Sequence, residues 1–326
     1  MKKLLWLEAV ILLILVVAAV FFWMQNAEPT FSPEDTPTTT PTETTAEPTT
    51  EATEPAPTWN TYPEDRQLLA RQYFVYDCNA DTFLVISGEE SERIYPASIT
   101  KLFTAYVAMQ YVDPETQITA GDALDLVAWG SSVAKIQKGD VLTAAQLVEA
   151  MLLPSGNDAA YLLACQAGRA IKGDPDLIPW TAVQVFMSQM NSQAQAVGMT
   201  GTHFVNPDGI HDKDHYTTFA DLAILGKLSM ENPTIMQHAV TPYREMELHG
   251  ETIQWKNTNA LVNPTTPYYC PYAIGLKTGQ TPSAGSCLLS AFRKDGQELL
   301  IGVFGCPEEK DRFDDTLQLF NEIVLK

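Results

Sequence analysis

Residues 95–112 read YPASITKLFTAYVAMQYV and place a serine and a lysine three positions apart, at Ser98 and Lys101. No glycine or proline follows Pro96 in this stretch, which predicts a helix over 98–112 that begins at Ser98. Positions i and i+3 share one face of a helix, so the Lys101 amine would reach the Ser98 hydroxyl. The first helical turn also offers unpaired backbone N–H groups to an anion. The spacing allows a serine nucleophile with a lysine base, but on this tetrapeptide alone a capping serine beside a solvent-facing lysine is the favoured interpretation.

A second serine and lysine stand at the same spacing, at Ser132 and Lys135. Gly139 follows soon after, and the neighbourhood contains no long helix. This second copy is therefore interpreted as a loop.

Two further tripeptides carry polar side chains at places where a cleft could form. The sequence SGN at 155–157 lies on a tight turn between helical stretches, where a hydroxyl and a carboxamide can point into one cleft. The sequence KTG at 277–279 ends a strand, and its cation beside a hydroxyl suits a carboxylate. Gly279 allows an extended peptide to approach the backbone closely. Taken singly, SGN favours ordinary turn chemistry, and KTG has the alternative interpretation of an exposed strand end with a turn glycine.

Together, the three motifs resemble the S-x-x-K, S-x-N and K-T-G set of penicillin-recognising serine enzymes. The resemblance is closer to the low-molecular-weight D-alanyl-D-alanine carboxypeptidases (peptidase family S11) and covers about residues 70–305. Five blocks carry it, in the family's order: YPASITKLFTA, LLPSGNDAAYLLA, MTGTHFVNPDGI, HYTTFADLA and GLKTGQTPSAGSCLLSAF. Ser98 stands 57 residues before Ser155, close to the family's spacing, whereas Ser132 stands only 23 before it. Ser98 is therefore the expected nucleophile.

The resemblance implies a role for each motif residue. Ser98 would attack the carbonyl between two D-alanines, and Lys101 would take its proton. That step requires the pKa of Lys101 to fall from about 10.4 to near neutral pH. Burial and the nearby Lys277 cation would both lower it. The resemblance implies that Ser155 relays a proton and that Asn157 contacts a substrate amide. Lys277, Thr278 and Gly279 would bind the terminal carboxylate and the peptide backbone. The backbone N–H of Gln280 would form the oxyanion site together with that of Ser98.

Gln280 is a departure from the family, which often has an aromatic residue or a histidine at that place. A backbone N–H survives a change of side chain, so only substrate fit is put in doubt. The implied partners are a peptidoglycan stem peptide ending in D-Ala-D-Ala and β-lactam inhibitors, with no cofactor and no metal.

The remaining pattern predicts a mixed α/β domain over 60–326. Strands are expected over 71–77 and 82–86 around a turn at 79–81, and again over 274–279, 286–294 and 298–305. Asp295-Gly296 joins the last two strands as a hairpin signal. Helical patterns run over 143–153, 158–171, 181–197, 217–230 and the C-terminal stretch. The expected fold class is β-lactamase/transpeptidase-like, an antiparallel sheet flanked by helices with an inserted helical lobe.

The N-terminal segments predict a tether. Residues 1–27 hold Lys2 and Lys3 before an apolar run from Ala9 to Met24, which favours a membrane anchor over a cleaved signal. Residues 28–59 hold twelve threonines and seven prolines and would form a disordered linker. The catalytic domain would then lie outside the cytoplasm, or be secreted if the signal is cleaved.

The composition of the chain, and residue types that it lacks at particular places, argue against several other classes of protein. A net charge of -20 argues against nucleic-acid binding. The five cysteines form no C-x-x-C pair, and buried free thiols are expected. The stretch HDKDH at 211–215 could hold a metal but is interpreted as a surface loop. A class A β-lactamase would need a glutamate that is absent between Asn157 and Glu231. A D,D-endopeptidase of the same family and a catalytically silent wall-binding module stay open as alternatives.

Overall fold

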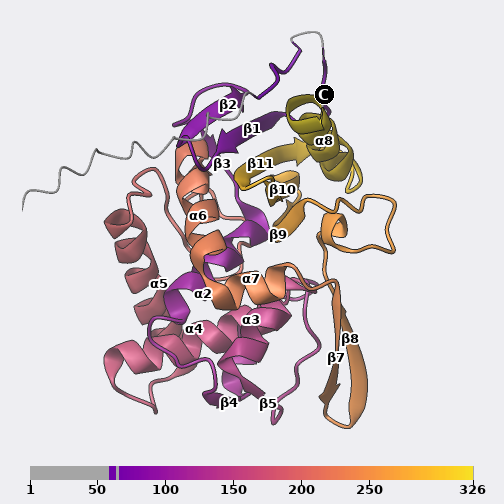
Figure 1. The fold of residues 1–326 in the computed structure, drawn as a ribbon. Helices are drawn as coiled ribbons and strands as arrows, with labels where there is room; N and C mark the ends of the chain where they lie inside the picture. The colour runs from indigo at the N-terminus through magenta and orange to yellow at the C-terminus, as the bar shows by residue number, and fades with distance from the viewer. Residues whose placement is uncertain (1–58, 64–65, 326) are drawn as a thin grey trace, which may run out of the picture. The chain divides into compact units, whose positions relative to one another are not determined.

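The computed structural model describes residues 59–63 and 66–325. A five-stranded antiparallel sheet stands beside a group of helices (Figure 1). The strand order is β2-β1-β11-β10-β9, so the first strands of the domain pair with the last ones. The strands are β1 Gln72–Asp77, β2 Thr82–Ile86, β9 Ala273–Thr281, β10 Gly285–Lys294 and β11 Gln297–Cys306.

Both faces of the sheet are buried, and alternate side chains fill two separate cores. On β1, Phe74 packs into the core formed with the helical lobe, whereas Val75 packs on the opposite face. On β11, Leu300 and Ile301 divide in the same way. Helix α8, Asp311–Phe320, covers the second face. Each such side chain contributes about 1.5–3 kcal/mol when fully buried, so the sheet is a rigid support for its edge strand β9.

The helical lobe lies between β3 and β9 in the sequence and packs around α2, which is buried along nearly its whole length. Thr143 caps α3 in the expected capping box with Gln146. The lobe's helical elements are η1 Ala97–Ile99, α2 Thr100–Ala108, η2 Asp122–Leu126, α3 Ala144–Leu152, α4 Asn157–Lys172, α5 Pro179–Ala196, α6 Phe219–Glu231 and α7 Pro233–Ala239.

Short elements complete the described chain. Three two-stranded pairs are β3 Arg93–Ile94 with β6 Thr217–Thr218, β4 Gln117–Thr119 with β5 Val141–Thr143, and β7 Tyr243–Leu248 with β8 Glu251–Lys256. The remaining elements are η3 Ala260–Val262 and a π-helical turn over Asn321–Leu325.

Most predicted elements are confirmed, with one clear correction at the first helix. The Asp295-Gly296 turn has φ values of +52° and +78°, as the predicted hairpin requires. The helix predicted over 98–112 is shorter, because α2 ends at Ala108 and the chain closes in tighter turns up to Val112. Ser98 lies in the 3-10 turn η1 and not in the α-helix itself.

The predicted anchor and most of the predicted linker lie outside the described residues. Within the described part, Trp59 donates a hydrogen bond to Asp77 at 2.5 Å. No helix in that part is long and apolar enough to cross a membrane. All five cysteines are unpaired, and all except the half-buried Cys78 are buried.

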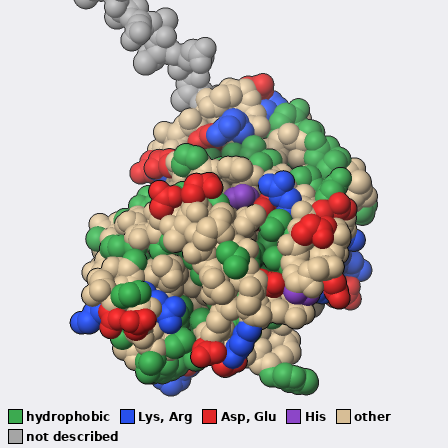
Figure 2. Space-filling model, turned by 90° about the horizontal axis from the view of Figure 1, so that it is seen from below, with side chains coloured by type: hydrophobic (Ala, Val, Ile, Leu, Met, Phe, Trp, Pro, Cys, Tyr) green, Lys and Arg blue, Asp and Glu red, His purple; other side chains and the backbone are tan. Residues whose placement is uncertain are grey.

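Charges of both signs are interspersed on the surface. In the view of Figure 2, lysine and arginine side chains stand in small groups beside acidic ones and form no broad basic patch on that face. This distribution gives no support to nucleic-acid binding there.

Candidate active site

Ser98 lies in a strained turn that is packed from two sides. Its neighbour Ala97 has a φ of +49°, which residues with a side chain rarely adopt. A Cβ at Gly209 would lie 1.9 Å from the Ala97 carbonyl oxygen, and one at Gly279 would lie 2.8 Å from the Pro96 oxygen. The turn is thus held between a loop and strand β9, and the glycine of KTG is needed for that close approach.

Lys101 follows one turn later, and its side chain is fully buried, with 0% exposed. Its Nζ lies 2.8 Å from the Oγ of Ser98 and 2.7 Å from the backbone oxygen of Asp208. Burial lowers the pKa of Lys101 to about 8, while the carboxyls of Asp208 and Asp158 act in the opposite direction. The decrease in pKa that Lys101 needs to act as a base therefore comes from burial. The reading of Lys101 as solvent-facing is wrong.

Asp208 supports both of these side chains through its backbone. The Ser98 hydroxyl lies 3.4 Å from the carbonyl oxygen that also accepts from Lys101. The carboxyl of Asp208 is buried, its Oδ2 has no hydrogen-bond partner among the residues that the structure describes, and burial raises the pKa of this carboxyl. No sequence signal identifies this residue, because a backbone oxygen can belong to any residue type.

Ser155 occupies the turn between α3 and α4, with a φ of +64°. It lines the same cavity as Ser98, which has a volume of about 350 Å³. The Ser132 hydroxyl donates to the Pro154 oxygen, and the Asn157 N–H donates to the Ser132 oxygen, both at 2.9 Å. The second S-x-x-K copy is therefore a loop, as interpreted, but it borders the cleft and holds the Ser155 turn.

The side chain of Asn157 is buried, and its Oδ1 has no hydrogen-bond partner within the described residues. An unpaired buried acceptor costs free energy until a donor arrives. Asn157 is thus suited to accept an N–H from a bound peptide.

Asp158 fastens the loop that holds the Ser155 turn. Its carboxylate accepts the N–H groups of Ala134 at 2.9 Å and Ile136 at 3.1 Å. The Trp255 indole donates to the Ala134 oxygen at 2.8 Å. Burial raises the pKa of Asp158, and the backbone donors oppose that shift. Loop and turn are therefore fixed together.

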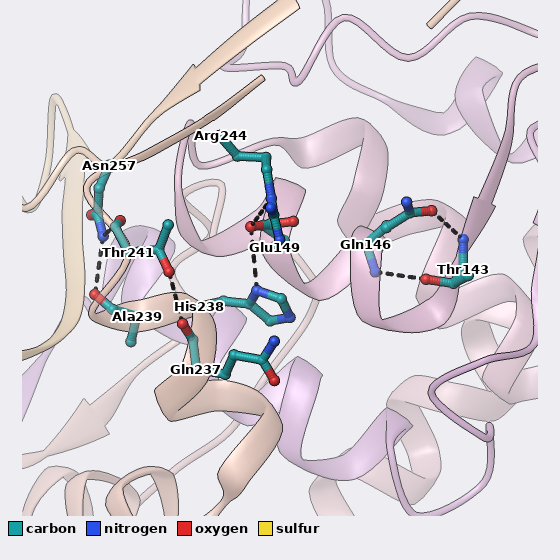
Figure 3. A network of polar contacts seen from close by, with 9 residues as sticks. All are labelled: Thr143, Gln146, Glu149, Gln237, His238, Ala239, Thr241, Arg244 and Asn257. Carbon is teal, nitrogen blue, oxygen red and sulfur yellow. Dashed lines mark hydrogen bonds and ion pairs between the residues drawn. The ribbon is translucent and has the colours of Figure 1, made fainter. Parts of the chain in front are cut away.

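A buried carboxylate also fixes the helix that leads to Ser155. Figure 3 shows the His238 imidazole of α7 and the Arg244 guanidinium of β7 pointing at Glu149 of α3. The Oε1 of Glu149 lies 3.0 Å from Arg244 Nε and 3.4 Å from His238 Nδ1. Burial alone would raise the pKa of Glu149, but these two contacts hold it below its usual value. The network joins α3 to α7 and to the β7–β8 hairpin.

Lys277 and Thr278 project from β9 on the other side of the cleft. Lys277 is fully buried, with 0% exposed, so the reading of KTG as an exposed strand end is wrong. Its Nζ lies 3.0 Å from the Thr278 oxygen and 3.3 Å from the hydroxyls of Thr258 and Thr278. Burial lowers the pKa of Lys277 well below its usual value, and the charges of Lys101 and Arg312 lower it further.

Arg312 of α8 adds a cation that the sequence did not reveal. It is buried, lines the cavity, and donates through NH1 to the Gly279 oxygen at 3.4 Å. Its Nε has no hydrogen-bond partner within the described residues. Burial lowers the pKa of Arg312, but a guanidinium stays charged in proteins. An arginine on an amphipathic helix usually faces solvent, so the pattern carried no signal for a role in the cleft.

The exposed rim of the cavity contains Gln280 at the end of β9 and Glu309 before α8. The carboxylate of Glu309 lies 3.7 Å from NH2 of Arg312. A hydroxyl with an adjacent amine thus faces a cation-rich wall. This arrangement can transfer an acyl group from a substrate that carries a carboxylate.

The stretch HDKDH requires a correction. Residues 211–214 are at least partly exposed, as a surface loop predicts, but His215 is only 2% exposed. Its hydrogen bonds draw it inward beneath the Ser98 turn, since Nε2 lies 2.8 Å from the Thr100 hydroxyl. No group of three or more His, Cys, Asp and Glu side chains within the described residues is arranged to hold a metal ion.

Comparisons with known proteins identify the family and the fold. The family described as D-alanyl-D-alanine carboxypeptidase matches residues 59–308. D-alanyl-D-alanine carboxypeptidase DacF of Bacillus subtilis (strain 168) is 28% identical over 71% of this chain and 57% of its own. The D-alanyl-D-alanine carboxypeptidase of Streptomyces sp. (strain K15) is 30% identical over 69% of this chain and 77% of its own. The chain therefore spans little more than half of the Bacillus relative.

The solved structure of the Streptomyces K15 DD-transpeptidase matches with a TM-score of 0.69 at 28% identity, covering 79% of this chain and 97% of that one. The predicted transpeptidase-like fold class is thus confirmed, with its five-stranded antiparallel sheet and flanking helices. The family match covers most of the chain, including all three motifs around the cavity. The chain belongs to the D-alanyl-D-alanine carboxypeptidases of peptidase family S11.

Proposed function

We propose that the protein is a serine D-alanyl-D-alanine carboxypeptidase that removes the terminal D-alanine from peptidoglycan stem peptides. The observation that carries the proposal is the 2.8 Å contact between the Ser98 Oγ and the Nζ of a fully buried lysine. A lysine in water stays protonated near neutral pH, whereas a desolvated one can act as a base.

In the acylation step, Lys101 accepts the Ser98 proton while Oγ attacks the carbonyl carbon between the two D-alanines. The resulting oxyanion is stabilised by the backbone N–H groups of Ser98 and Gln280. The C–N bond then breaks, and the proton reaches the leaving amine through Ser155. The products of this step are an ester on Ser98 and free D-alanine.

The cationic wall binds the terminal carboxylate of the peptide. Lys277, Thr278 and Arg312 supply charge-assisted donors to it. The low pKa of Lys277 follows from burial beside other cations, so an arriving carboxylate favours its protonation. Asn157 accepts from a backbone N–H of the peptide. The carboxylate and the N–H groups of the peptide thus pair with the buried donors and acceptors of the site.

Turnover of a peptide that ends in D-Ala-D-Ala tests the proposal. We expect release of D-alanine, and a rate at least about 10³-fold lower in Ser98→Ala, because the nucleophile is lost. Ser132→Ala is the matched control, since Ser132 is the serine of the second S-x-x-K copy and should keep measurable turnover. Absence of D-alanine release from the folded wild type, or full activity of Ser98→Ala, would contradict the proposal.

The fate of the ester separates hydrolysis from related reactions. The Streptomyces K15 relative of known structure is named a DD-transpeptidase, whereas the Bacillus relative is named a carboxypeptidase. Both names fit an acyl-enzyme, which water or an amine can attack. Adding a peptide with a free amine to the same assay distinguishes hydrolysis from transpeptidation. Formation of a joined peptide would indicate transpeptidation instead of the proposed hydrolysis. Cleavage of a cross-linked dimer would indicate the endopeptidase instead.

We further propose that residues 1–27 anchor the protein and residues 28–59 act as a tether outside the cytoplasm. Support comes from the apolar run after Lys2 and Lys3 and from the Thr- and Pro-rich composition that follows. Alkaline extraction of membranes from cells that make the full chain is the test. Retention in the membrane is expected, and release into the medium as a shortened chain would indicate a cleaved signal.

A further inference from the structure

The buried side chain of His215 lies beneath the Ser98 turn and has no role in the reaction proposed above. His215 stands just before β6 and is 2% exposed. Its ring meets the ring of Phe204 edge-on, with centroids 5.5 Å apart. It is not among the residues that line the cavity, so it is placed to act on the site through other groups.

The hydrogen bonds of His215 fix which of its nitrogens carries the proton. The Val205 N–H donates to Nδ1 at 3.1 Å, so Nδ1 must be unprotonated. The hydroxyl of Thr100 already donates to the Ala97 oxygen at 2.8 Å, so it accepts from Nε2–H, also at 2.8 Å. The donors therefore run in one direction, from Val205 through the imidazole and Thr100 to Ala97.

This chain of hydrogen bonds joins the two segments that set the geometry of Ser98 and Lys101. One segment is the 97–100 turn, where Ala97 holds a φ of +49° directly before Ser98. The other is the 205–210 loop, whose Asp208 oxygen accepts from Lys101 at 2.7 Å. Gly209 of this loop also lies directly against the Ala97 carbonyl. A shift of either segment would change the distance between the Ser98 hydroxyl and the Lys101 amine.

The surroundings keep the ring neutral. Burial lowers the pKa of His215 to about 3, the charges of His203, His211 and Lys101 lower it too, and only Asp212 raises it. A proton on Nδ1 would face the Val205 N–H and break the chain at its start. The neutral form with hydrogen on Nε2 is thus the one that fits both partners.

We propose that His215 is a positioning residue for acylation: its neutral imidazole, bridging Val205 and Thr100, holds the Ala97–Ser98 turn at bonding distance from Lys101. The inference rests on the proposed function, because it assigns the ring a part in the same reaction. His215 itself contacts no substrate.

Three variants test this role through the rate of acylation by a penicillin, normalised to the amount of protein that is finally labelled. His215→Phe removes both hydrogen bonds while keeping a flat ring. His215→Gln carries one acceptor and one donor at similar spacing and is the conservative rescue. His203→Gln is the matched control, because His203 is an exposed histidine of the neighbouring strand pairing and belongs to no part of the site.

We expect acylation by His215→Phe to be about 10²-fold slower at unchanged final labelling, as for a misplaced nucleophile. His215→Gln should recover most of that loss, and His203→Gln should match the wild type. Equal rates for His215→Phe and wild type, or equally slow Phe and Gln variants, would overturn the proposal. Incomplete final labelling in His215→Phe alone would mean a role in folding and would overturn it as well.

A measurement that needs no turnover separates this inference from the proposed function. The ¹⁵N resonances of His215 in the full chain should show an unprotonated Nδ1 and a protonated Nε2 from about pH 5 to pH 8. Protonation of Nδ1 in that range would overturn the inference. Wild-type protein that forms no penicillin adduct but keeps this signature would contradict the proposed function alone.

Discussion

The two walls of the cleft differ in how complete they are without a substrate. On the wall formed by η1, α2 and the 205–210 loop, the reacting groups are already paired, because the Lys101 amine hydrogen-bonds both the Ser98 hydroxyl and the Asp208 backbone oxygen; we call this the paired wall. On the wall formed by β9 and α8, the charge of Arg312 contributes to the low pKa of Lys277, and the Nε of Arg312 has no hydrogen-bond partner within the described residues. The first wall is preorganised for chemistry, whereas the second is completed by an anion.

The largest effect is expected from removing the base of the paired wall. Lys101→Met should lower the rate of penicillin acylation at least about 10³-fold, because Ser98 loses its proton acceptor. Stopped-flow labelling measures this rate. Lys135→Met is the matched control, since Lys135 is the exposed lysine of the second S-x-x-K copy and should leave the rate unchanged. A Lys101→Met variant that acylates at the wild-type rate would remove the distinction between the walls.

The cationic wall should discriminate between substrates by their carboxylate. Arg312→Leu should lower kcat/KM for a peptide with a free terminal carboxylate by about 10- to 100-fold, the loss of one charge-assisted contact. The same peptide with a terminal carboxamide should react equally with both proteins. Arg293→Leu, at an exposed arginine paired with Glu298, is the control. Equal losses for carboxylate and carboxamide would mean that Arg312 acts on the fold and not on the anion.

The pH dependence of acylation should follow the protonation of Lys101 on the paired wall. Because burial lowers the pKa of Lys101 to about 8, its protonated form dominates below that pH and cannot accept a proton. The acylation rate should therefore rise about tenfold per pH unit up to about pH 8 and level off above it. Rates measured under single-turnover conditions give this profile. A flat profile between about pH 6 and pH 9 would argue against Lys101 as the base.

The smallest effect is expected from the acidic rim. Glu309 lies beside Arg312 and competes with a substrate carboxylate for it, but the side chain is largely exposed and its field is screened. Glu309→Gln should lower KM for a carboxylate-terminated peptide by about two- to fivefold. Glu308→Gln changes the net charge equally, yet Glu308 pairs with Lys310, so KM should stay constant. A decrease of the same size in both variants would indicate a general charge effect.

Local signals in the sequence were sufficient for much of the fold. The β10–β11 hairpin followed from Asp295-Gly296, and the start of α3 followed from Thr143 and Gln146. The β7–β8 hairpin was missed. Its turn is His249-Gly250, with φ values of +41° and +82°, and a histidine is not a usual residue for such a turn.

The motif residues could be placed near one cleft from their order and spacing, but their partners could not. Asp208, Arg312 and His215 act through contacts with residues that are far away in the sequence. Their roles depend on burial and on the meeting of separate segments, which periodicity does not report. The same limit applies to Lys277, which could have stood at an exposed strand end but is fully buried.

Locating the penicillin adduct by peptide mapping of the full chain tests the central claim most directly. We expect one adduct per molecule, on the peptide that contains Ser98, with a rate that follows the pKa of Lys101. An adduct on Ser132 or Ser155, or no adduct on folded protein, would contradict the assignment of Ser98 and Lys101 as nucleophile and base.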